Sequence, residues 1–125
     1  MNTKIKIIVT HEEIANRWFE CFNTKQLDEL ISLYAENARH FSPKLKLRKP
    51  ETGGWIEGQS ALKAWWADAF QRLPSLRYDV KTLTANEQRI FMEYRRTVQG
   101  EEDMMIAEVL EIREGKIQSS RVYHA

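Results

Sequence analysis

The first part of the chain repeats apolar residues at the spacing of amphipathic helices. Ile14, Trp18 and Phe22 recur every four residues, which predicts a helix that ends near Phe22. A second helix is expected after the turn at residues 23–25 and reaches about Leu33. Two consecutive apolar helix faces need a broad surface to cover, so we expect a sheet elsewhere in the chain to pack against them.

The start of the first helix is predicted from a local capping pattern. Thr10-His11-Glu12-Glu13 has the form of a capping box, with Thr10 as the N-cap and the Glu13 carboxylate turned back towards it. His11 is then expected to be a solvated residue of the first turn. This interpretation divides the chain into an N-terminal extension, residues 1–10, and one domain, residues 11–125.

A strand is expected at residues 35–43, where His40 and Ser42 point to the same face. The basic segment after it, residues 44–49, alternates leucine with lysine and arginine. One interpretation is a solvated loop that contains a short edge strand. The other is a rim over a pocket, which would favour anionic ligands.

A third helix is expected to start at Gly58-Gln59-Ser60, with Ser60 as its cap, and to stop at Pro74. Its apolar residues fall on one broad face, which we expect to line one wall of a cavity. They are Leu62, Trp65, Trp66, Ala69, Phe70 and Leu73.

The hydrophobic period changes to two after Pro74, and this change predicts strands at about residues 76–82, 90–98, 104–112 and 116–124. Helices followed by a meander of strands predict an α+β fold, with three helices packed on a curved, mainly antiparallel sheet. Both faces of the strands carry large residues, so we expect a homodimer partner to cover the outer face. The residues of that face are Phe91, Glu93, Arg95, Thr97, Met105, Ala107 and Val109.

Composition adds a few limits to this picture. The net charge of +1 over 125 residues gives no field that would favour a nucleic acid or a membrane as a partner. Cys21 is the single cysteine, which excludes an intrachain disulfide and fits a reducing compartment. The N-terminus lacks the features of a signal peptide and the chain lacks a long apolar run, so a cytoplasmic location is expected.

Three motifs occur in an order that is typical of one superfamily: 28-DELISLYAENA-38, 58-GQSAL-62 and 114-EGKI-117. On these motifs, residues 11–125 resemble the nuclear-transport-factor-2-like (NTF2-like) superfamily and most closely its SnoaL-like branch. The resemblance implies a cone-shaped α+β fold. That superfamily contains steroid isomerases, polyketide cyclases, dehydratases, epoxide hydrolases and non-catalytic association modules, so the resemblance alone leaves the function open.

The steroid isomerases of the superfamily allow a comparison residue by residue. Their general-base aspartate corresponds to Ser42, and the tyrosine that acts as an oxyanion donor corresponds to Trp18. Their protonated aspartic acid corresponds to a position near Glu108. The aspartate base of the polyketide cyclases would lie on the last strand, where residues 120–124 hold no carboxyl group. Neither mechanism is therefore expected to be complete in this chain.

Strand alternation, combined with this alignment, still selects a convergent polar set. The candidate catalytic residues are His40, Arg96, Glu108 and His124. His40 or His124 would be a general base near neutral pH, Arg96 would hold an oxyanion, and Glu108 would orient a histidine or act as an acid with a raised pKa. The candidate ligand-binding residues are Trp18, Ser42, Trp55, Trp66, Tyr94 and Ser120.

The same polar residues also have a purely structural interpretation, an ion pair between Arg96 and Glu108 with hydrogen-bonded histidines around it. A metal site formed by His40, Glu108 and His124 is not expected, because these residues lack short-range ligand spacing, and no cofactor is expected. Two function classes remain open. One is an enzyme that transfers protons on a small, apolar, oxygenated molecule, such as an isomerase, cyclase or dehydratase. The other is a non-catalytic module for small-ligand binding or association.

Overall fold

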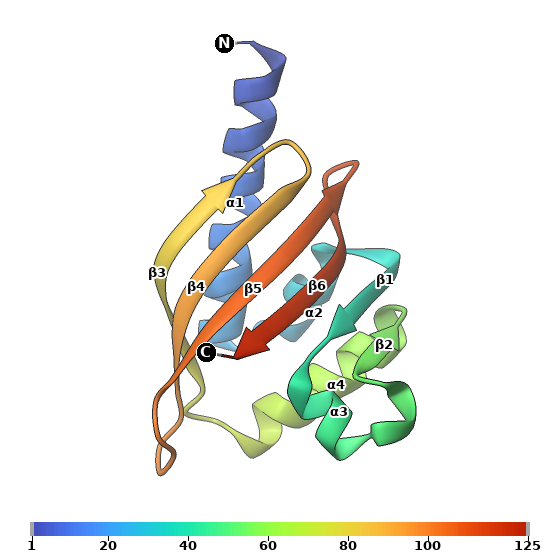
Figure 1. Ribbon diagram of the computed structural model, residues 1–125, viewed down its shortest axis with the longest axis vertical. Coiled ribbons are helices and arrows are strands. Elements are labelled where there is room, and N and C mark those ends of the chain that lie inside the picture. Colours follow the sequence, from blue (N-terminus) through green and yellow to red (C-terminus); the bar gives the residue numbers. More distant parts are fainter. Residues whose placement is uncertain (1, 125) are drawn as a thin grey trace.

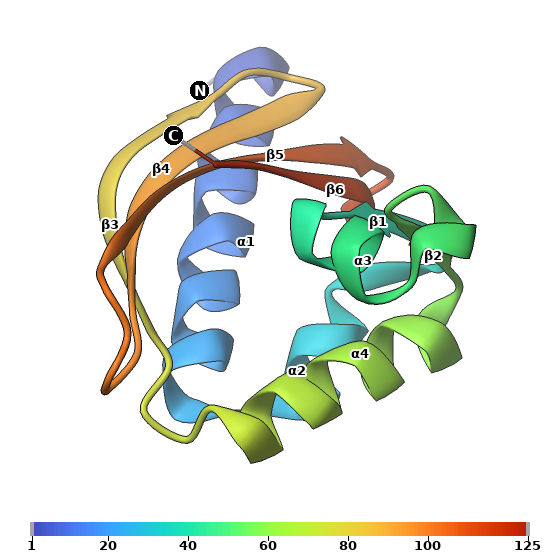
Figure 2. The same cartoon turned by 60° about the horizontal axis from the view of Figure 1, so that its bottom comes forward.

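The computed structural model describes residues 2–124 and places a set of helices on one side of a curved sheet (Figures 1 and 2). The helices are α1 (Thr3–Thr24), α2 (Leu27–Ser32), α3 (Pro43–Arg48) and α4 (Gln59–Arg72), with a 3-10 turn, η1, at Pro50–Thr52. The strands are β1 (Tyr34–Phe41), β2 (Trp55–Glu57), β3 (Arg77–Ala85), β4 (Arg89–Thr97), β5 (Met104–Arg113) and β6 (Lys116–His124). The predicted α+β class and the four C-terminal strands are confirmed.

The sheet has the strand order β2-β1-β6-β5-β4-β3. All neighbouring strands are antiparallel except β1 and β6, which are parallel. Figure 2 shows the sheet curving around α1, with α2 and α4 closing the open side of the curve. Glu108 lies opposite Val122 and Leu110 lies opposite Ser120, so Glu108, Leu110, Ser120 and Val122 face the concave side together.

Helix α1 begins eight residues before its predicted start near His11. Asn2 is the N-cap, because its side-chain oxygen accepts a hydrogen bond of 2.9 Å from the Ile5 amide. Thr10 lies inside the helix, where its hydroxyl donates to the Lys6 carbonyl oxygen at 3.0 Å. The expected capping box is therefore wrong, and residues 3–10 form the first turns of a continuous helix.

His11 is buried, contrary to the prediction that it would be a solvated first-turn residue. Its Nδ1 lies 2.9 Å from the carbonyl oxygen of Asn86, in the turn between β3 and β4, and donates a hydrogen bond to it. Lys4 and Glu87 form an exposed ion pair of 3.8 Å beside this contact. The first turns of α1 thus pack against a segment far away in the sequence, and a local sequence pattern could not reveal that packing.

Helix α3 replaces the loop or edge strand expected after the first strand. Strand β1 ends at Phe41, two residues before its predicted end, because Ser42 is the N-cap of α3 and Pro43 is its first residue. Proline is suited to that position because its backbone has no N–H to be left unpaired. The alternation of leucine and lysine is helical here, with Leu45 fully buried and Leu47 81% exposed.

Helix α4 follows β2 and begins two residues earlier than the predicted cap implies. Its N-cap is Gly58, with a φ of 90°, and the predicted cap Ser60 is the second residue of the helix. Leu62 and Trp66 of its apolar face are buried in the core. None of the helices in residues 2–124 has the length and apolar character needed to cross a membrane.

The core centres on an aromatic cluster between α1 and the concave face of the sheet. Trp18 is 1% exposed, and its ring lies within 6 Å of the rings of Phe19, Phe22, Tyr78 and Tyr94. Aromatic rings at these separations pack favourably and bury large areas, so this cluster fixes α1 against β3 and β4. It also forms the floor beneath the region where the polar side chains of the concave face meet.

Candidate functional site

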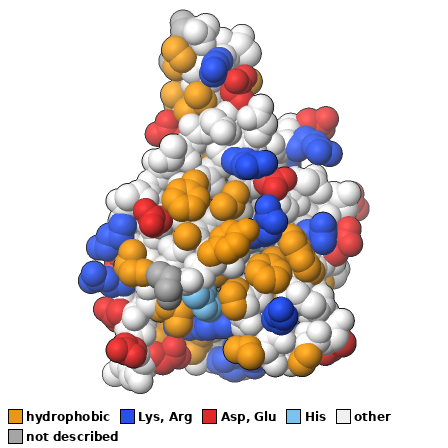
Figure 3. Space-filling model, viewed as in Figure 1, with side chains coloured by type: hydrophobic (Ala, Val, Ile, Leu, Met, Phe, Trp, Pro, Cys, Tyr) orange, Lys and Arg blue, Asp and Glu red, His pale blue; other side chains and the backbone are white. Residues whose placement is uncertain are grey.

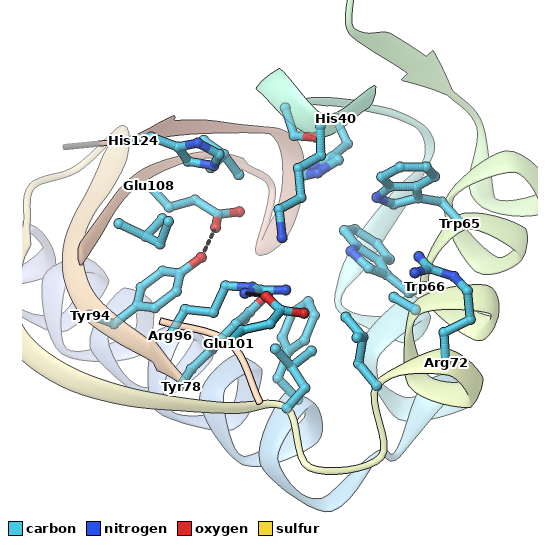
Figure 4. Close-up of a pocket in the computed structure, with 18 of the residues that line it drawn as sticks. His40, Trp65, Trp66, Arg72, Tyr78, Tyr94, Arg96, Glu101, Glu108 and His124 are labelled. Atoms are coloured by element: carbon cyan, nitrogen blue, oxygen red, sulfur yellow. Dashed lines mark hydrogen bonds and ion pairs between the residues drawn. The ribbon is translucent and has the colours of Figure 1, made fainter. Parts of the chain in front are cut away.

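A cavity of about 220 Å³ lies between the concave face of the sheet and helices α3 and α4 (Figure 4). Its apolar lining includes Phe22, Trp65, Trp66, Leu76, Ile106 and Val122, and its polar lining includes His40, Ser42, Tyr94, Arg96, Glu108 and His124. The four predicted catalytic residues therefore all reach one cavity. Strand alternation placed them correctly because β1, β4, β5 and β6 turn the same face inward.

Glu108 is the buried acid of this cavity. Its side chain comes from the middle of β5 and is 2% exposed. The hydroxyl of Tyr94 donates a hydrogen bond of 2.7 Å to its Oε1 (Figure 4). Burial raises the pKa of Glu108 to about 8, although the hydrogen bond from Tyr94 opposes this rise. The carboxyl group is consequently protonated near neutral pH.

The second oxygen of Glu108 has no partner. Among residues 2–124, Oε2 of Glu108 is the only buried side-chain nitrogen or oxygen without a hydrogen bond. An unsatisfied buried polar atom is costly, and such an atom calls for a physical explanation. Because Oε1 accepts from Tyr94, the proton of the neutral acid belongs on Oε2, where it is available to an acceptor in the cavity.

His40 ends a directional chain of buried hydrogen bonds. The indole N–H of Trp18, which can only donate, lies 3.0 Å from the hydroxyl oxygen of Tyr34. The Tyr34 hydroxyl donates to Oγ of Ser120 at 3.2 Å, and that Oγ lies 2.7 Å from Nδ1 of His40. Within residues 2–124, Nδ1 is the only acceptor within hydrogen-bond distance of the Ser120 hydroxyl, so Ser120 is assigned as the donor to Nδ1. His40 is assigned as the tautomer that carries its proton on Nε2.

The surroundings of His40 do not suit the general base that was expected there. The ring is 3% exposed and packs against Trp66, with 5.0 Å between ring centres. Burial lowers the pKa of His40 to about 3, so the imidazole stays neutral near pH 7 and is a weak base. Its lone-pair nitrogen is already occupied by Ser120. His40 is therefore suited to be a hydrogen-bond donor and not a general base.

Arg96 does not form the predicted ion pair with Glu108. It lies opposite Met104 in the pairing of β4 with β5, while Glu108 lies opposite Met92, four residues before Arg96 on β4. Its guanidinium instead donates to the carboxylate of Glu101 at 2.9 Å, in the loop between these strands. The hydrogen bond from Arg96 lowers the pKa of Glu101. Glu108 is therefore left without a charged partner.

His124, at the end of β6, is exposed and lines the cavity near its opening. Burial lowers its pKa, and the positive charges of Lys44 and Arg96 lower it further. A neutral imidazole therefore predominates at pH 7, and unlike His40 it forms no hydrogen bond within residues 2–124 that occupies a ring nitrogen. Among those residues, no three His, Cys, Asp or Glu side chains cluster as the ligands of a metal ion would.

The six predicted ligand-binding residues fall into three groups. Trp66 and Tyr94 line the cavity, and so does Ser42, although its hydroxyl accepts from the Leu45 amide as the cap of α3. Ser120 acts behind His40. Trp18 and Trp55 do not line the cavity.

These two tryptophans have structural surroundings that explain the difference. Trp18 is held in the core by the hydrogen bond to Tyr34 and by its aromatic neighbours. Trp55 lies on edge strand β2, where the guanidinium of Arg39 lies 4.1 Å from its ring centre. Its placement beside Ser119 and Arg121 puts it over the other face of the sheet.

Several cavity residues were not among the predicted site residues: Lys44, Arg48, Arg72, Tyr78 and Glu101. A sequence signal existed for two of them. Ser42-Pro43 is a helix start, and in a helix Lys44 and Arg48 are four residues apart and share a face. The pocket-rim interpretation of residues 44–49 had anticipated their location. Arg72 and Glu101 reach the cavity through tertiary packing, for which the sequence carries no comparable signal.

The helix order, the curved sheet and the cavity at its concave face define an NTF2-like α+β protein. The family model of the SnoaL-like domain matches residues 15–120. The chain therefore belongs to the SnoaL-like domain family, as the sequence motifs had indicated. No curated protein matches the chain.

Solved structures share this fold at low sequence identity. A SnoaL-like protein of unknown function from Burkholderia thailandensis is 20% identical, with a TM-score of 0.84 over 94% of this chain and 95% of that one. A proposed ketosteroid isomerase from Kribbella flavida is 19% identical, with a TM-score of 0.77 over 94% and 79%. A proposed polyketide cyclase from Sinorhizobium meliloti is 16% identical, with a TM-score of 0.75 over 89% and 94%. At such identities the likeness extends to the fold alone.

Proposed function

We propose that this SnoaL-like domain binds a small, apolar, oxygenated molecule in its cavity, and that Glu108 donates its proton to an oxygen of that molecule. The observation that carries this proposal is the unpartnered Oε2 of Glu108, which is buried, protonated near pH 7 and directed into the cavity. A carbonyl oxygen of a ligand would complete its hydrogen bonding. The neutral Nε2–H of His40 offers a second donor from β1, which is separated from β5 by β6.

The size and lining of the cavity limit the ligand. Its volume of about 220 Å³ is below the range of about 300–1,000 Å³ that is common for drug-sized ligands. Trp65 and Trp66 form an aromatic wall on α4. These features favour a molecule with one aromatic or alicyclic ring, or two fused rings, and an oxygen at one end.

Proton transfer in this cavity would use Glu108 as the acid. As the hydroxyl proton of Glu108 moves to a carbonyl oxygen, a C–H proton next to the carbonyl leaves to a base and a neutral enol forms. The resulting carboxylate keeps its hydrogen bond from Tyr94. A pKa of about 8 lies near the operating pH, which suits a group that must lose and regain a proton. His124 is the base that this geometry favours, because its imidazole is neutral and lines the cavity.

A non-catalytic binding module is the second candidate function. It is favoured by one specific observation: His40, the deepest histidine, is held as a neutral donor and cannot serve as a base near neutral pH. In this case, Glu108 and His40 would only hydrogen-bond a ligand, and no proton would be transferred.

Acetophenone is a suitable first probe because it combines one aromatic ring with a carbonyl oxygen and exchangeable methyl protons. Binding is measured by NMR titration, and exchange of the methyl protons in D₂O is followed by proton NMR. Glu108→Leu removes the donor and is expected to weaken binding by about tenfold or more, the equivalent of one hydrogen bond left unmade in a buried site. Binding that is unchanged in Glu108→Leu would contradict the proposal.

Glu108→Gln separates catalysis from binding. The glutamine amide still accepts from Tyr94 and still presents an N–H to the cavity, but it cannot give up a proton. An enzyme is expected to keep acetophenone binding in this variant and to lose the protein-dependent exchange of the methyl protons. A binding module shows no protein-dependent exchange even in the wild type.

A further inference from the structure

Positive side chains collect around the cavity. Lys44 and Arg48 of α3, Arg72 of α4 and Arg96 of β4 all belong to its lining. Arg72 and Arg96 come from opposite walls in Figure 4, so the charge surrounds the space instead of lying on one side of it. Arg48 also lies over the ring of Trp65, 5.7 Å from its centre, which places it where the aromatic wall ends.

These four cations have too few negative partners. Asp68 accepts from Arg72 at 2.8 Å and lies 3.5 Å from Arg48. The carboxylate of Glu101 lies 2.9 Å from the guanidinium of Arg96 and balances its charge. Glu108 is protonated near neutral pH and adds no charge. In the described part of the chain, four cations are therefore balanced by two carboxylates.

Lys44 is the one of these four cations without a counterion within residues 2–124. Within residues 2–124, no carboxylate lies in salt-bridge distance of its Nζ, and its side chain is only partly exposed. Burial lowers the pKa of Lys44, and the positive charge of Arg96 lowers it further; Glu101 opposes this, and Arg72 and Arg48 add smaller decreases. Positive charges that disfavour one another at the edge of an apolar cavity would be stabilised by a bound anion.

We propose that the ligand of this cavity carries an anionic group, a carboxylate or a phosphate ester, which Lys44 binds together with Arg48 and Arg72 at the opening. This inference rests on the proposed function, because it assigns the outer end of the same ligand whose oxygen contacts Glu108. The substrate class is thus a small amphipathic acid. Its apolar body lies against Trp65 and Trp66, and its anionic group lies towards α3 and the end of α4.

The test compares acetophenone with 4-acetylbenzoate, which adds a carboxylate at the far end of the ring from the carbonyl. Binding of both probes to the full chain is measured by NMR titration. A charge-assisted hydrogen bond to Lys44 is expected to make 4-acetylbenzoate bind about tenfold tighter than acetophenone at low salt. Raising the salt concentration should reduce this advantage and leave acetophenone binding unchanged, because salt screens only the charged contact.

Matched variants assign the effect to the cavity. Lys44→Gln is expected to abolish the advantage, so that 4-acetylbenzoate and acetophenone bind this variant with similar affinity. Lys46→Gln is the control, because Lys46 lies two residues further along α3 but is exposed and outside the lining. Both variants remove one positive charge, so an equal loss in both would show a general effect of net charge and would overturn the inference.

The outcomes separate this inference from the proposed function. Acetophenone binding that depends on Glu108, with no advantage for 4-acetylbenzoate, overturns the anion site and leaves the proposed function standing. An advantage that depends on Lys44 but not on Glu108 supports the anion site and removes the proposed role of Glu108. If neither probe binds, both fail. 4-Acetylphenyl phosphate, titrated in parallel, decides which of the two anionic groups is preferred.

Discussion

Tyr94 donates a hydrogen bond of 2.7 Å to Oε1 of Glu108, and this bond determines what the other oxygen of the carboxyl group can do. The two residues lie on adjacent strands, β4 and β5, and both are almost completely buried. With Oε1 acting as an acceptor and the carboxyl group protonated, Oε2 becomes a donor that faces the cavity. The hydrogen bond from the Tyr94 phenol thus leaves the carboxyl proton of Glu108 on the oxygen that faces the cavity.

The raised pKa of Glu108 predicts how stability depends on pH. Its folded pKa of about 8 lies above the ordinary value of 4.5, so between these pH values the folded state holds a proton that the unfolded chain has released. The contribution of the neutral acid to stability is complete below pH 4.5 and is lost as the pH rises towards 8. Wild type loses this contribution and Glu108→Gln does not. The free energy of unfolding of the variant minus that of wild type is therefore expected to rise by roughly a few kcal/mol from pH 4.5 to pH 8.

Urea unfolding of the two proteins at a series of pH values measures this difference. Glu102→Gln is a suitable control, because Glu102 lies in the loop between β4 and β5 with an exposed side chain. Parallel stability curves for wild type and Glu108→Gln would mean that Glu108 titrates normally in the folded protein.

The environment of His40 predicts the opposite dependence on pH. Its folded pKa of about 3 lies below the ordinary 6.5, so the unfolded chain binds a proton that the folded state excludes. Stability is consequently lost as the pH falls from 6.5 towards 3, and His40→Gln is expected to remove this part of the acid sensitivity. Nitrogen-15 NMR is expected to show the Nε2–H tautomer throughout pH 5 to 8, and titration of His40 near pH 6.5 would contradict the assignment.

Ser120 provides a second check on His40. In Ser120→Ala the donor to Nδ1 is absent, and Tyr34 also loses its acceptor. The variant is expected to be less stable by about 1–3 kcal/mol, the cost of leaving buried polar groups unpaired. It should also give up the fixed tautomer, which the same NMR spectra would detect.

The positions of the site residues were predictable, but their interactions were not. The period of two fixed which residues of β4, β5 and β6 share the inner face, and so it brought Tyr94, Glu108 and Ser120 together. It could not give the partner of Arg96, because Glu101 lies in a loop whose conformation follows from the hairpin as a whole. Nor could it show that Ser120 holds the ring nitrogen of His40, since β1 and β6 pair across 80 residues of sequence.

The predicted start of the first helix was wrong for a related reason. The capping pattern at Thr10 was a valid local signal. Contacts of His11 with Asn86 and of Lys4 with Glu87 nevertheless stabilise the helical turns that precede Thr10. Exposed Ile5 and Val9 lie in these first turns and gave no reason to expect a helix there, because β-branched residues favour strands. Tertiary packing here outweighs local preference.

Trp18 allows a comparison between a core tryptophan and a cavity tryptophan. Trp18→Phe removes the indole N–H that reaches Tyr34 and leaves space in the aromatic cluster. A loss of about 1–3 kcal/mol in the free energy of unfolding is expected, with acetophenone binding per folded molecule unchanged. Trp66→Phe changes the cavity wall and is expected to weaken binding. Equal binding losses in the two variants would place Trp18 in the site after all.

The face of the sheet turned away from the helices carries hydrophobic side chains in Figure 3. Phe91, Met105 and Tyr123 are 42%, 39% and 46% exposed there, and Phe91 lies opposite Val109 on the adjacent strand. We propose that a second copy of the chain covers this face. Glu93 and Arg95 lie beside the apolar residues on β4, so two copies related by a twofold axis can place opposite charges against each other.

Sedimentation equilibrium at micromolar concentration is expected to give twice the monomer mass of 14.8 kDa. Phe91→Glu puts a charge at the centre of the proposed interface and is expected to give the monomer without a change in fold, because the side chain is partly exposed in the single chain. Leu47→Glu is the matched control, since Leu47 is also an exposed apolar residue but lies on α3. A wild-type protein that sediments as a monomer would contradict the dimer, and dissociation by Leu47→Glu alone would place the interface elsewhere.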